Sequence, residues 1–278
     1  LLYDVLYHAA SSTLDELAKD SKYLGADIGY ICILHTWGSA MNYHPHIHTI
    51  VLGGGLDKDS KWKDTGGKFF LPYGVIAKVF RGKYLCELKS LWNDSRLEFH
   101  GTAEKYQNHC FKGLLDECYK KDWVAYCKET FNGAQSVINY LGKYTHRIAI
   151  SNHRIKSMTE ATVTYAVKDY KNKGQWKEKT VPGEEFIRRF LMHVPPKRFV
   201  RIRHYGLLSC RNKSKKMTHC RNLLGCKKYI SALKNRSATE MIKLLYNIDV
   251  CRCSSCGGKM VPHLPDKHTP SVLAHMRC

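Results

Sequence analysis

The chain has 278 residues, enough for one large or two modest domains, and its 45 Lys and Arg against 24 Asp and Glu give a formal net charge of +21. Such an excess is not needed for folding and costs self-repulsion, so it indicates a polyanionic partner. No apolar run approaches the roughly 18 residues of a membrane-spanning helix and no secretory leader is visible, so we expect a soluble, cytoplasmic protein without a membrane partner.

Helical and strand patterns are mixed along the chain without a strict βαβ rhythm. In the first third they predict a helix over 2–20, an antiparallel pair of strands at 28–34 and 46–52, a short strand at 69–71 and a helix over 75–91. Further on they predict a helix over 106–119, a strand at 123–127, a helix over 134–144, strands at 147–151, 161–168 and 178–181, a helix between Pro182 and Pro195, and a strand at 199–203. The mixture predicts an α+β fold in which helices flank a central antiparallel sheet.

The second predicted strand carries an alternating set of histidines. His44, His46 and His48 precede an apolar run that ends at three glycines. Because alternate side chains of a strand share a face, the imidazoles would project together. Hydrogen-bonded core histidines are the plain alternative, but a cluster of this kind favours metal or phosphate chemistry.

Two tyrosines lie four residues apart on the helix predicted at 134–144. Tyr140 and Tyr144 would leave the same helix face, beside an apolar stripe that seats the helix on the sheet. They are either partly buried packing residues or nucleophiles. A histidine metal site in a polyanion-binding protein favours the second reading.

The positive charge is concentrated near the C-terminal end. Residues 197–236 contain 13 Lys and Arg and no Asp or Glu. A solvated basic face is the usual explanation of a charge run, but 40 residues without an acid are better explained by phosphate contacts. Tyr205 and nearby arginines would add stacking groups suited to single-stranded or distorted nucleic acid.

The last segment contains half of a zinc site. Cys253 and Cys256 have the spacing of a zinc knuckle and are followed by Gly257. The other two ligands would come from Cys220, Cys251, His263, His268, His275, Cys278 or residues preceding Leu1. The alternative is a set of reduced thiols without a metal.

Several motifs together resemble the IS91-type two-tyrosine transposases of the HUH endonuclease superfamily. They are Ile-Leu-His35-Thr-Trp-Gly, His44-Pro-His46-Ile-His48, Val-Phe-Arg81-Gly-Lys, Tyr140-Leu-Gly-Lys-Tyr144-Thr-His-Arg and Arg-Ile-Arg-His-Tyr205-Gly-Leu-Leu, in that order. The resemblance runs from the first residues to about Gly225. Because family members have an N-terminal cysteine-rich segment, we also expect residues, including the first sheet strand, to precede Leu1.

The resemblance implies an enzyme that nicks and rejoins single-stranded DNA at the ends of an insertion element, by a rolling-circle-like route. Tyr140 and Tyr144 would form 5′-phosphotyrosyl links. His46 and His48 would bind Mg²⁺ or Mn²⁺; His35, 11 residues before His46 as in relaxases, is the preferred third ligand, with His44 as the alternative. An all-imidazole set by itself would suggest zinc, copper or nickel.

We also expect a set of side chains to contact DNA: Arg81, Lys143, Arg147, Arg201, Arg203, Tyr205, Arg211, Lys215 and Lys216. We expect three regions: an HUH nuclease domain at 1–208, as the resemblance implies, then a basic helical DNA-binding extension at 209–250 and a zinc-binding segment at 251–278. The expected location is the bacterial cytoplasm, at the nucleoid when DNA is bound, and no small-molecule substrate is expected.

Three alternatives stay open at this point. A basic zinc-containing DNA-binding protein without catalysis would leave the histidines and tyrosines unused. A zinc hydrolase would use His35, His46 and His48 but lacks a clear Glu or Asp base near them. The chain could also be a truncated, inactive remnant of a transposase.

Overall fold

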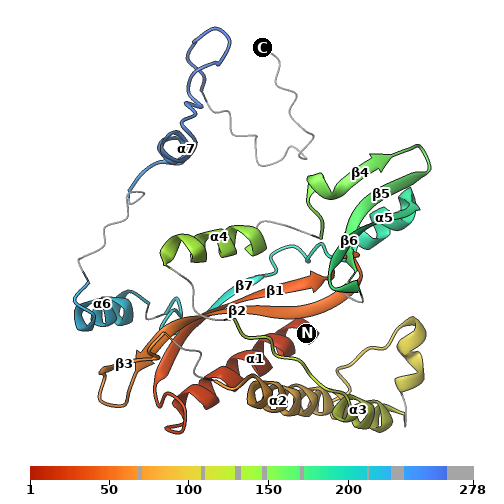
Figure 1. The fold of residues 1–278 in the computed structure, drawn as a ribbon, viewed down its shortest axis with the longest axis vertical. Helices are drawn as coiled ribbons and strands as arrows, with labels where there is room; N and C mark the ends of the chain where they lie inside the picture. Colours follow the sequence, from red (N-terminus) through yellow and green to blue (C-terminus); the bar gives the residue numbers. More distant parts are fainter. Residues whose placement is uncertain are drawn as a thin grey trace. The chain divides into compact units, whose positions relative to one another are not determined.

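The computed structural model describes residues 1–67, 71–107, 110–128, 133–145, 149–169, 172–211, 213–226 and 235–261, without the side chains of 134 and 143–145 (Figure 1). The chain divides into two compact units, Leu1–Cys226 and Lys227–Cys278. None of the described helices combines the length and the apolar character that crossing a bilayer requires.

A four-stranded antiparallel sheet forms the centre of the first unit. Its strand order is β3-β2-β1-β7, where β1 is Asp27–Trp37, β2 is Tyr43–Leu56, β3 is Trp62–Asp64 and β7 is Ile202–Gly206. The expected pairing of the first two strands is confirmed, and both are longer than predicted. The last strand begins three residues later than predicted, because the residues that pair with β1 are 202–206 while Val200 is 60% exposed.

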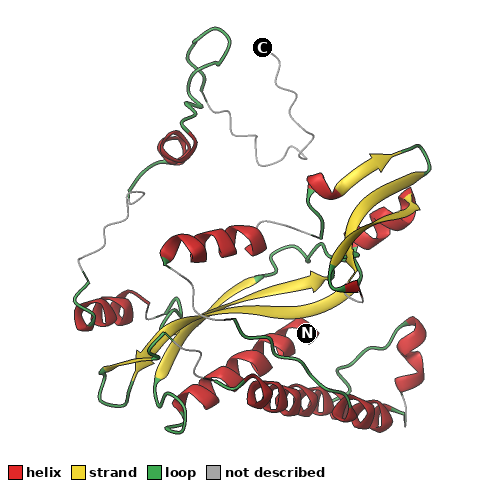
Figure 2. Ribbon diagram, in the orientation of Figure 1, coloured by secondary structure: helices red, strands yellow, loops and turns green. Residues whose placement is uncertain are grey.

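Helices cover both faces of this sheet. Helix α1 (Leu2–Lys19) and helix α2 (Tyr73–Asn93) lie on one face, and helix α4 (Ala134–Thr145) lies over the other (Figures 1 and 2). The first face holds the main apolar core, in which Tyr7, Tyr30 and Leu34 are buried. The Tyr30 hydroxyl donates to Ser11 O at 3.0 Å, and Tyr7 donates to Arg201 O, so both buried hydroxyls are satisfied.

A smaller antiparallel sheet follows, in the order β4-β5-β6. Its strands are β4 (Ile155–Met158), β5 (Thr162–Asp169) and β6 (Gln175–Pro182), and helix α5 (Gly183–Leu191) packs against it. Its core includes Met41 and Tyr165, so the loop between β1 and β2 is held by this second sheet. The helix predicted after Pro182 and the two longer strands are confirmed.

The remaining elements are short. They are the 3-10 helices η1 (Gly101–Tyr106) and η2 (Asn152–Arg154), helix α3 (Phe111–Lys120), helix α6 (Lys213–Leu223) and, in the second unit, helix α7 (Ala238–Tyr246). In α7 the Ser237 side chain and Glu240 form a capping box at the N-terminus.

Two local predictions are wrong. Residues 123–127 form no strand: Trp123 packs on Phe80 and Tyr84, while Val124 is 88% exposed and no neighbouring strand is available to it within the described ranges. Residues 149–151 are not in a strand either; 146–148 lie outside the described residues. Of the strand predicted at 69–71, only Leu71 is described, and it is buried in the main core. The mixed α+β architecture with antiparallel sheets and flanking helices is confirmed.

Candidate metal centre and active site

Three histidines converge on the sheet face below α4. His35 on β1 is the direct cross-strand partner of His46 on β2, and His48 shares the same face of β2. One ring nitrogen of each lies within 4.8 Å of the others, and Nε2 of His46 is 3.1 Å from Nε2 of His48. Within the described ranges, this is the one cluster of three or more His, Cys, Asp or Glu side chains with metal-site spacing.

The environment of His46 and His48 disfavours their charged forms. Burial lowers the pKa of His46, while its hydrogen bond to His44 O acts in the opposite direction. Burial, together with the neighbouring His35 and His46, lowers the pKa of His48 to about 3. A neutral imidazole has a lone pair to donate, so the residues present fit a cation.

His44 does not belong to the cluster. Its side chain is exposed, and its carbonyl oxygen accepts a 2.7 Å hydrogen bond from Nδ1 of His46. That bond orients the His46 ring with Nε2 toward His48, as an outer partner of a ligand histidine does. Of the two candidates for the third ligand, the structure brings His35 into place.

Tyr140 on α4 reaches the same cluster. Its hydroxyl oxygen is 2.9 Å from Nδ1 of His48. If Nε2 of His48 serves as the ligand atom, the proton of the neutral ring is on Nδ1, which then donates to the tyrosine oxygen. This contact brings one tyrosine of α4 to the histidines, while Ile138, in the apolar stripe predicted from the sequence, is 59% exposed. The backbone of Tyr144 lies one turn further along α4, and its side chain is outside the described residues.

His193, in the turn after α5, contacts the segment that carries His35. It is 3% exposed, and its ring nitrogens lie 3.1 Å from Thr36 Oγ1 and 3.2 Å from Met41 O. It therefore ties the end of β1 to the loop before β2. Trp37, packed edge-on to His193, stacks on His35 with ring centroids 4.4 Å apart. Through Thr36 and Trp37, His193 therefore fixes the part of β1 that directly follows His35.

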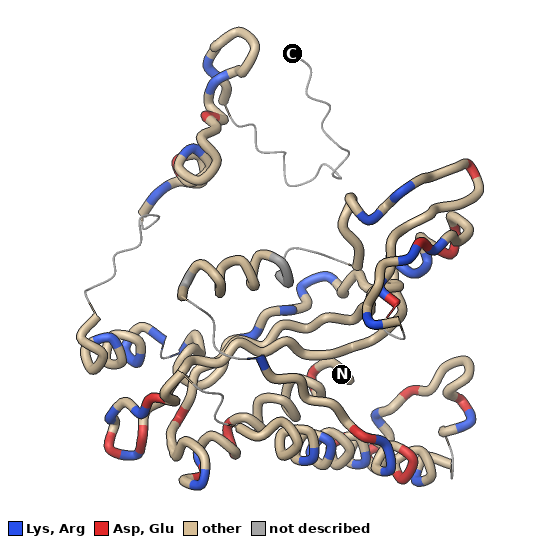
Figure 3. The backbone as a smooth tube through the Cα atoms, in the orientation of Figure 1, with Lys and Arg blue, Asp and Glu red and all other residues tan. Residues whose placement is uncertain are grey.

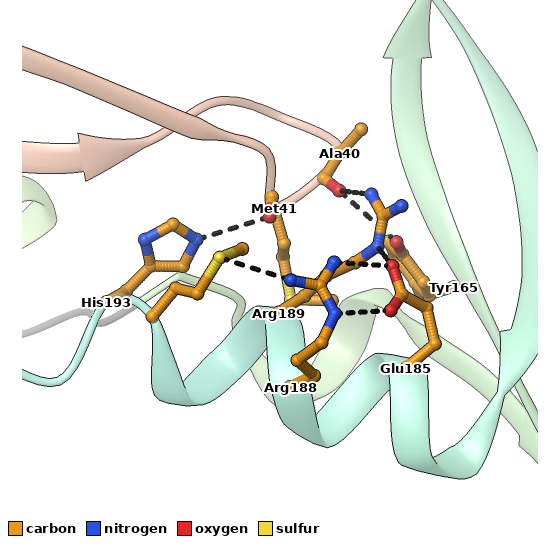
Figure 4. Close-up of polar contacts among 8 residues, drawn as sticks. Ala40, Met41, Tyr165, Glu185, Arg188, Arg189 and His193 are labelled. Atoms are coloured by element: carbon orange, nitrogen blue, oxygen red, sulfur yellow. Dashed lines mark hydrogen bonds and ion pairs between the residues drawn. The ribbon is translucent and has the colours of Figure 1, made fainter. Parts of the chain in front are cut away.

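A second set of contacts holds the same loop from α5 (Figure 4). Glu185 accepts from Arg188 at 2.6 Å and from Arg189 at 2.7 Å, which lowers the pKa of that carboxyl to about 2. Arg189 also donates to Ala40 O at 3.3 Å. Sequence reasoning missed this support, because the contacts join residues about 150 positions apart; the polar residues on an amphipathic helix were the only signal.

Not every residue expected to contact DNA lies near this face. Arg203 and Tyr205 point to the α1 side: Arg203 pairs with Asp4 at 2.6 Å and lies over the Tyr7 ring, and Tyr205 stacks on Tyr30. Arg81 is on α2, across the sheet from the histidines, where it donates to the backbone oxygens of Tyr119 and Lys121 at the C-terminal end of α3.

Arg201 and the α6 lysines are placed differently. Arg201 is half-buried with its guanidinium 6.0 Å from the Trp37 ring centroid. Arg211 and Lys215 are exposed and Lys216 is half-buried, in the basic stretch that runs into α6 (Figure 3). Arg147 and the Lys143 side chain lie outside the described residues.

The cysteine segment of the second unit forms a tight turn. Cys253 N donates to Gly258 O and Gly257 N donates to Cys253 O, both at 2.9 Å. The backbones of Arg252 and Lys259 form an antiparallel β-bridge. Hydrogen bonds from the backbone at Cys256 and Ser255 lower the pKa of the Cys253 thiol. Cys220, by contrast, is buried in α6 of the first unit. His263, His268, His275 and Cys278 lie outside the described residues.

A family model described as "putative transposase" (Y2_Tnp) matches residues 29–216, which include the three histidines and Tyr140. The chain belongs to this transposase family. It is 40% identical over 227 residues to the "putative transposase y4qJ" of Sinorhizobium fredii, covering 81% of this chain and 57% of that protein. It is 29% identical over 272 residues to the transposase for insertion sequence element IS801 of Pseudomonas savastanoi pv. phaseolicola, covering 94% and 62%.

The expected kinship with IS91-type two-tyrosine transposases is thereby confirmed. The chain spans about three-fifths of the length of the curated transposases it matches, 57% and 62%. No solved structure matches it.

Proposed function

We propose that the chain is the strand-cleaving and strand-joining part of a DNA transposase that works through a 5′-phosphotyrosyl intermediate in rolling-circle-like transposition. The observation that carries the proposal is the 2.9 Å contact between the Tyr140 hydroxyl and Nδ1 of His48, a member of the histidine cluster. A nucleophile beside a cation site is a combination suited to phosphodiester cleavage.

His35, His46 and His48 would hold Mg²⁺ or Mn²⁺. Three imidazoles also suit zinc and other later transition metals, and membership of the transposase family favours the two harder ions. When bound, the cation supplies positive charge at a phosphate oxygen. We propose that the sheet, α4 and the His193 contacts hold the ligands and the nucleophile in fixed relation, which is the positioning that phosphoryl transfer depends on.

Tyr140 would make the new bond. Its oxygen bonds to phosphorus, the bond to the 3′ oxygen breaks, and the proton lost by the phenol is balanced by the one gained by the departing 3′-hydroxyl. The Nδ1 proton of His48 stabilises the charge that develops on the tyrosine oxygen. The phosphotyrosyl bond preserves the ester, so attack by a 3′-hydroxyl reseals the strand without ATP. Tyr144 is proposed as the nucleophile of a second strand transfer. Either tyrosine is proposed to be able to form the first link, and both are required for a complete transfer cycle.

The proposed partner is single-stranded DNA at the ends of an insertion element, which would place the protein in the bacterial cytoplasm and at the nucleoid. The exposed Arg211 and Lys215 and the half-buried Lys216 suit phosphate contacts beyond the histidine face. We keep the predicted division into an HUH nuclease domain at 1–208, a basic extension at 209–250 and a zinc segment at 251–278. The turn at Cys253 and Cys256 supports the last assignment.

A gel assay for covalent protein–oligonucleotide adducts tests the proposal. With Mn²⁺ and a single-stranded oligonucleotide carrying an element end, we expect an adduct that survives denaturation, with a new 3′-hydroxyl on the released strand. Tyr140→Phe and Tyr144→Phe should each leave some nicking, and the double variant none. The change removes only the hydroxyl, so packing is preserved.

Three outcomes would contradict the proposal. Binding without an adduct would indicate a non-catalytic DNA-binding protein or an inactive remnant. Cleavage without an adduct would indicate a hydrolase. An undiminished adduct in the double variant would place the nucleophile elsewhere.

A further inference from the structure

A hollow lies between α6 and the end of the central sheet, apart from the histidine cluster. Its lining is Leu52, Gly53, Trp62, Asp64, Met217, Cys220, Arg221 and Leu224. The volume is about 250 Å³, room for a group much larger than a few water molecules. Most of the exposed lining is apolar, and its two charged side chains are Asp64 and Arg221.

One residue of the lining, Trp62, has a buried donor. Nε1 of Trp62 is inaccessible to solvent and has no hydrogen-bond partner within the described part of the chain. A buried N–H without an acceptor is costly, so a ligand that brings an acceptor to Nε1 would gain from the contact. The indole ring also lies directly against Gly54: a Cβ there would be 2.5 Å from Trp62 Cζ2, so only glycine permits this position of the ring.

The hollow is on the same sheet face as the candidate active site. Leu52 follows His48 by four residues of β2, which corresponds to roughly 13 Å along the strand and keeps both side chains on one face. α6 closes the other side, and His219 fixes it to the β2–β3 turn through a 2.9 Å contact with Ser60 O. The helix carries Lys213, Lys215 and Lys216 and no acidic residue.

We propose that this hollow binds one unstacked base of the single strand, next to the nucleotides at the cleavage site. The Trp62 ring and Met217 would contact the faces of the base, the Trp62 N–H would donate to a ring nitrogen or carbonyl, and Asp64 would accept from an exocyclic amine. The α6 lysines would contact the flanking phosphates. The inference rests on the proposed function, in that it assumes a single strand across the histidine face.

An abasic scan tests it. The full chain is titrated with single-stranded oligonucleotides carrying an element end, each lacking one base. In the wild type we expect one position, at a fixed distance from the nicked phosphate, where base removal weakens binding roughly five-fold or more. Met217→Trp fills the hollow and should abolish that penalty. Trp62→Phe keeps the ring, removes the donor, and should weaken discrimination between bases at that position.

Trp176→Phe is the matched control, since Trp176 is 57% exposed on β6 of the smaller sheet; it should keep the wild-type profile. A flat scan in the wild type, or an unchanged profile in both Met217→Trp and Trp62→Phe, would overturn the inference. Adduct formation measured on the same samples separates the two proposals. A position-specific profile without an adduct would support base binding in the hollow and contradict the proposed nicking activity. An adduct with a flat profile would support nicking and contradict base binding in the hollow.

Discussion

The two faces of the central sheet are built from the same strands and carry different side chains. Leu34 points into the α1 core and is 2% exposed, while its neighbour His35 points to the opposite face and joins His46 and His48. Because side chains alternate along a strand, the packing core and the histidine cluster are separated by one residue. We therefore expect the stability and the activity of this protein to respond to different variants, even at adjacent positions.

The largest expected effect follows from the histidine face. His46→Ala or His48→Ala should lower nicking by at least about 100-fold, since removal of a ligand weakens cation binding. Affinity for single-stranded DNA should change little, because binding depends on distributed basic side chains. His44→Ala, at an exposed position, is the control and should keep near-normal nicking. Wild-type cleavage rates in a folded His46→Ala/His48→Ala protein would remove the metal assignment.

The packing face should give the opposite result. Leu17 on α1 is 6% exposed in the main core, so Leu17→Ala should lower the free energy of unfolding by about 2–5 kcal/mol. Denaturant titration measures this change. Nicking per folded molecule should be unaffected under native conditions. A cleavage defect without loss of stability would show that the two faces are not independent.

A smaller effect concerns the basic side chains. Affinity for single-stranded DNA should fall with salt at about −0.7 per phosphate contact, so neutral substitutions at Lys215 and Lys216 should flatten the slope by up to about 1.4. Arg203→Met should leave the slope unchanged, because Arg203 pairs with Asp4 on the packing face. Fluorescence anisotropy at several salt concentrations measures both. A salt slope that changes in Arg203→Met and not in the lysine variants would place the bound DNA on the α1 side.

Some of this arrangement could be predicted from sequence and some could not. Alternation brought the β2 histidines to one face, and helical spacing brought Tyr140 to an edge of α4. The same alternation puts His204 on the opposite face of β7 from Arg203 and Tyr205. Which of the two faces turns toward α1 depends on the pairing of β7 with β1, about 170 residues away in sequence. The His193 contacts are also long-range and leave no local pattern. β3 and β4 have 3 and 4 residues, too few to show periodicity.

A further effect is expected on stability in acid. His48 has a folded-state pKa of about 3, below its usual 6.5. Between those values the unfolded state binds the proton and the folded state does not, so stability falls as the pH drops from about 6.5 to about 3. Urea unfolding of chelator-treated protein should show this slope, and His48→Gln should reduce it. An equal slope in both proteins would mean that His48 is not kept neutral by burial.

The most direct test that the histidine face is a metal site, distinct from the packing face, is Mn²⁺ binding measured by electron paramagnetic resonance on the full chain. We predict that the wild type binds one more Mn²⁺ than His46→Ala/His48→Ala does. Tyr140→Phe and His44→Ala should retain that ion, since neither changes the three ring nitrogens of the cluster. Equal Mn²⁺ binding by the wild type and the double histidine variant would contradict the account.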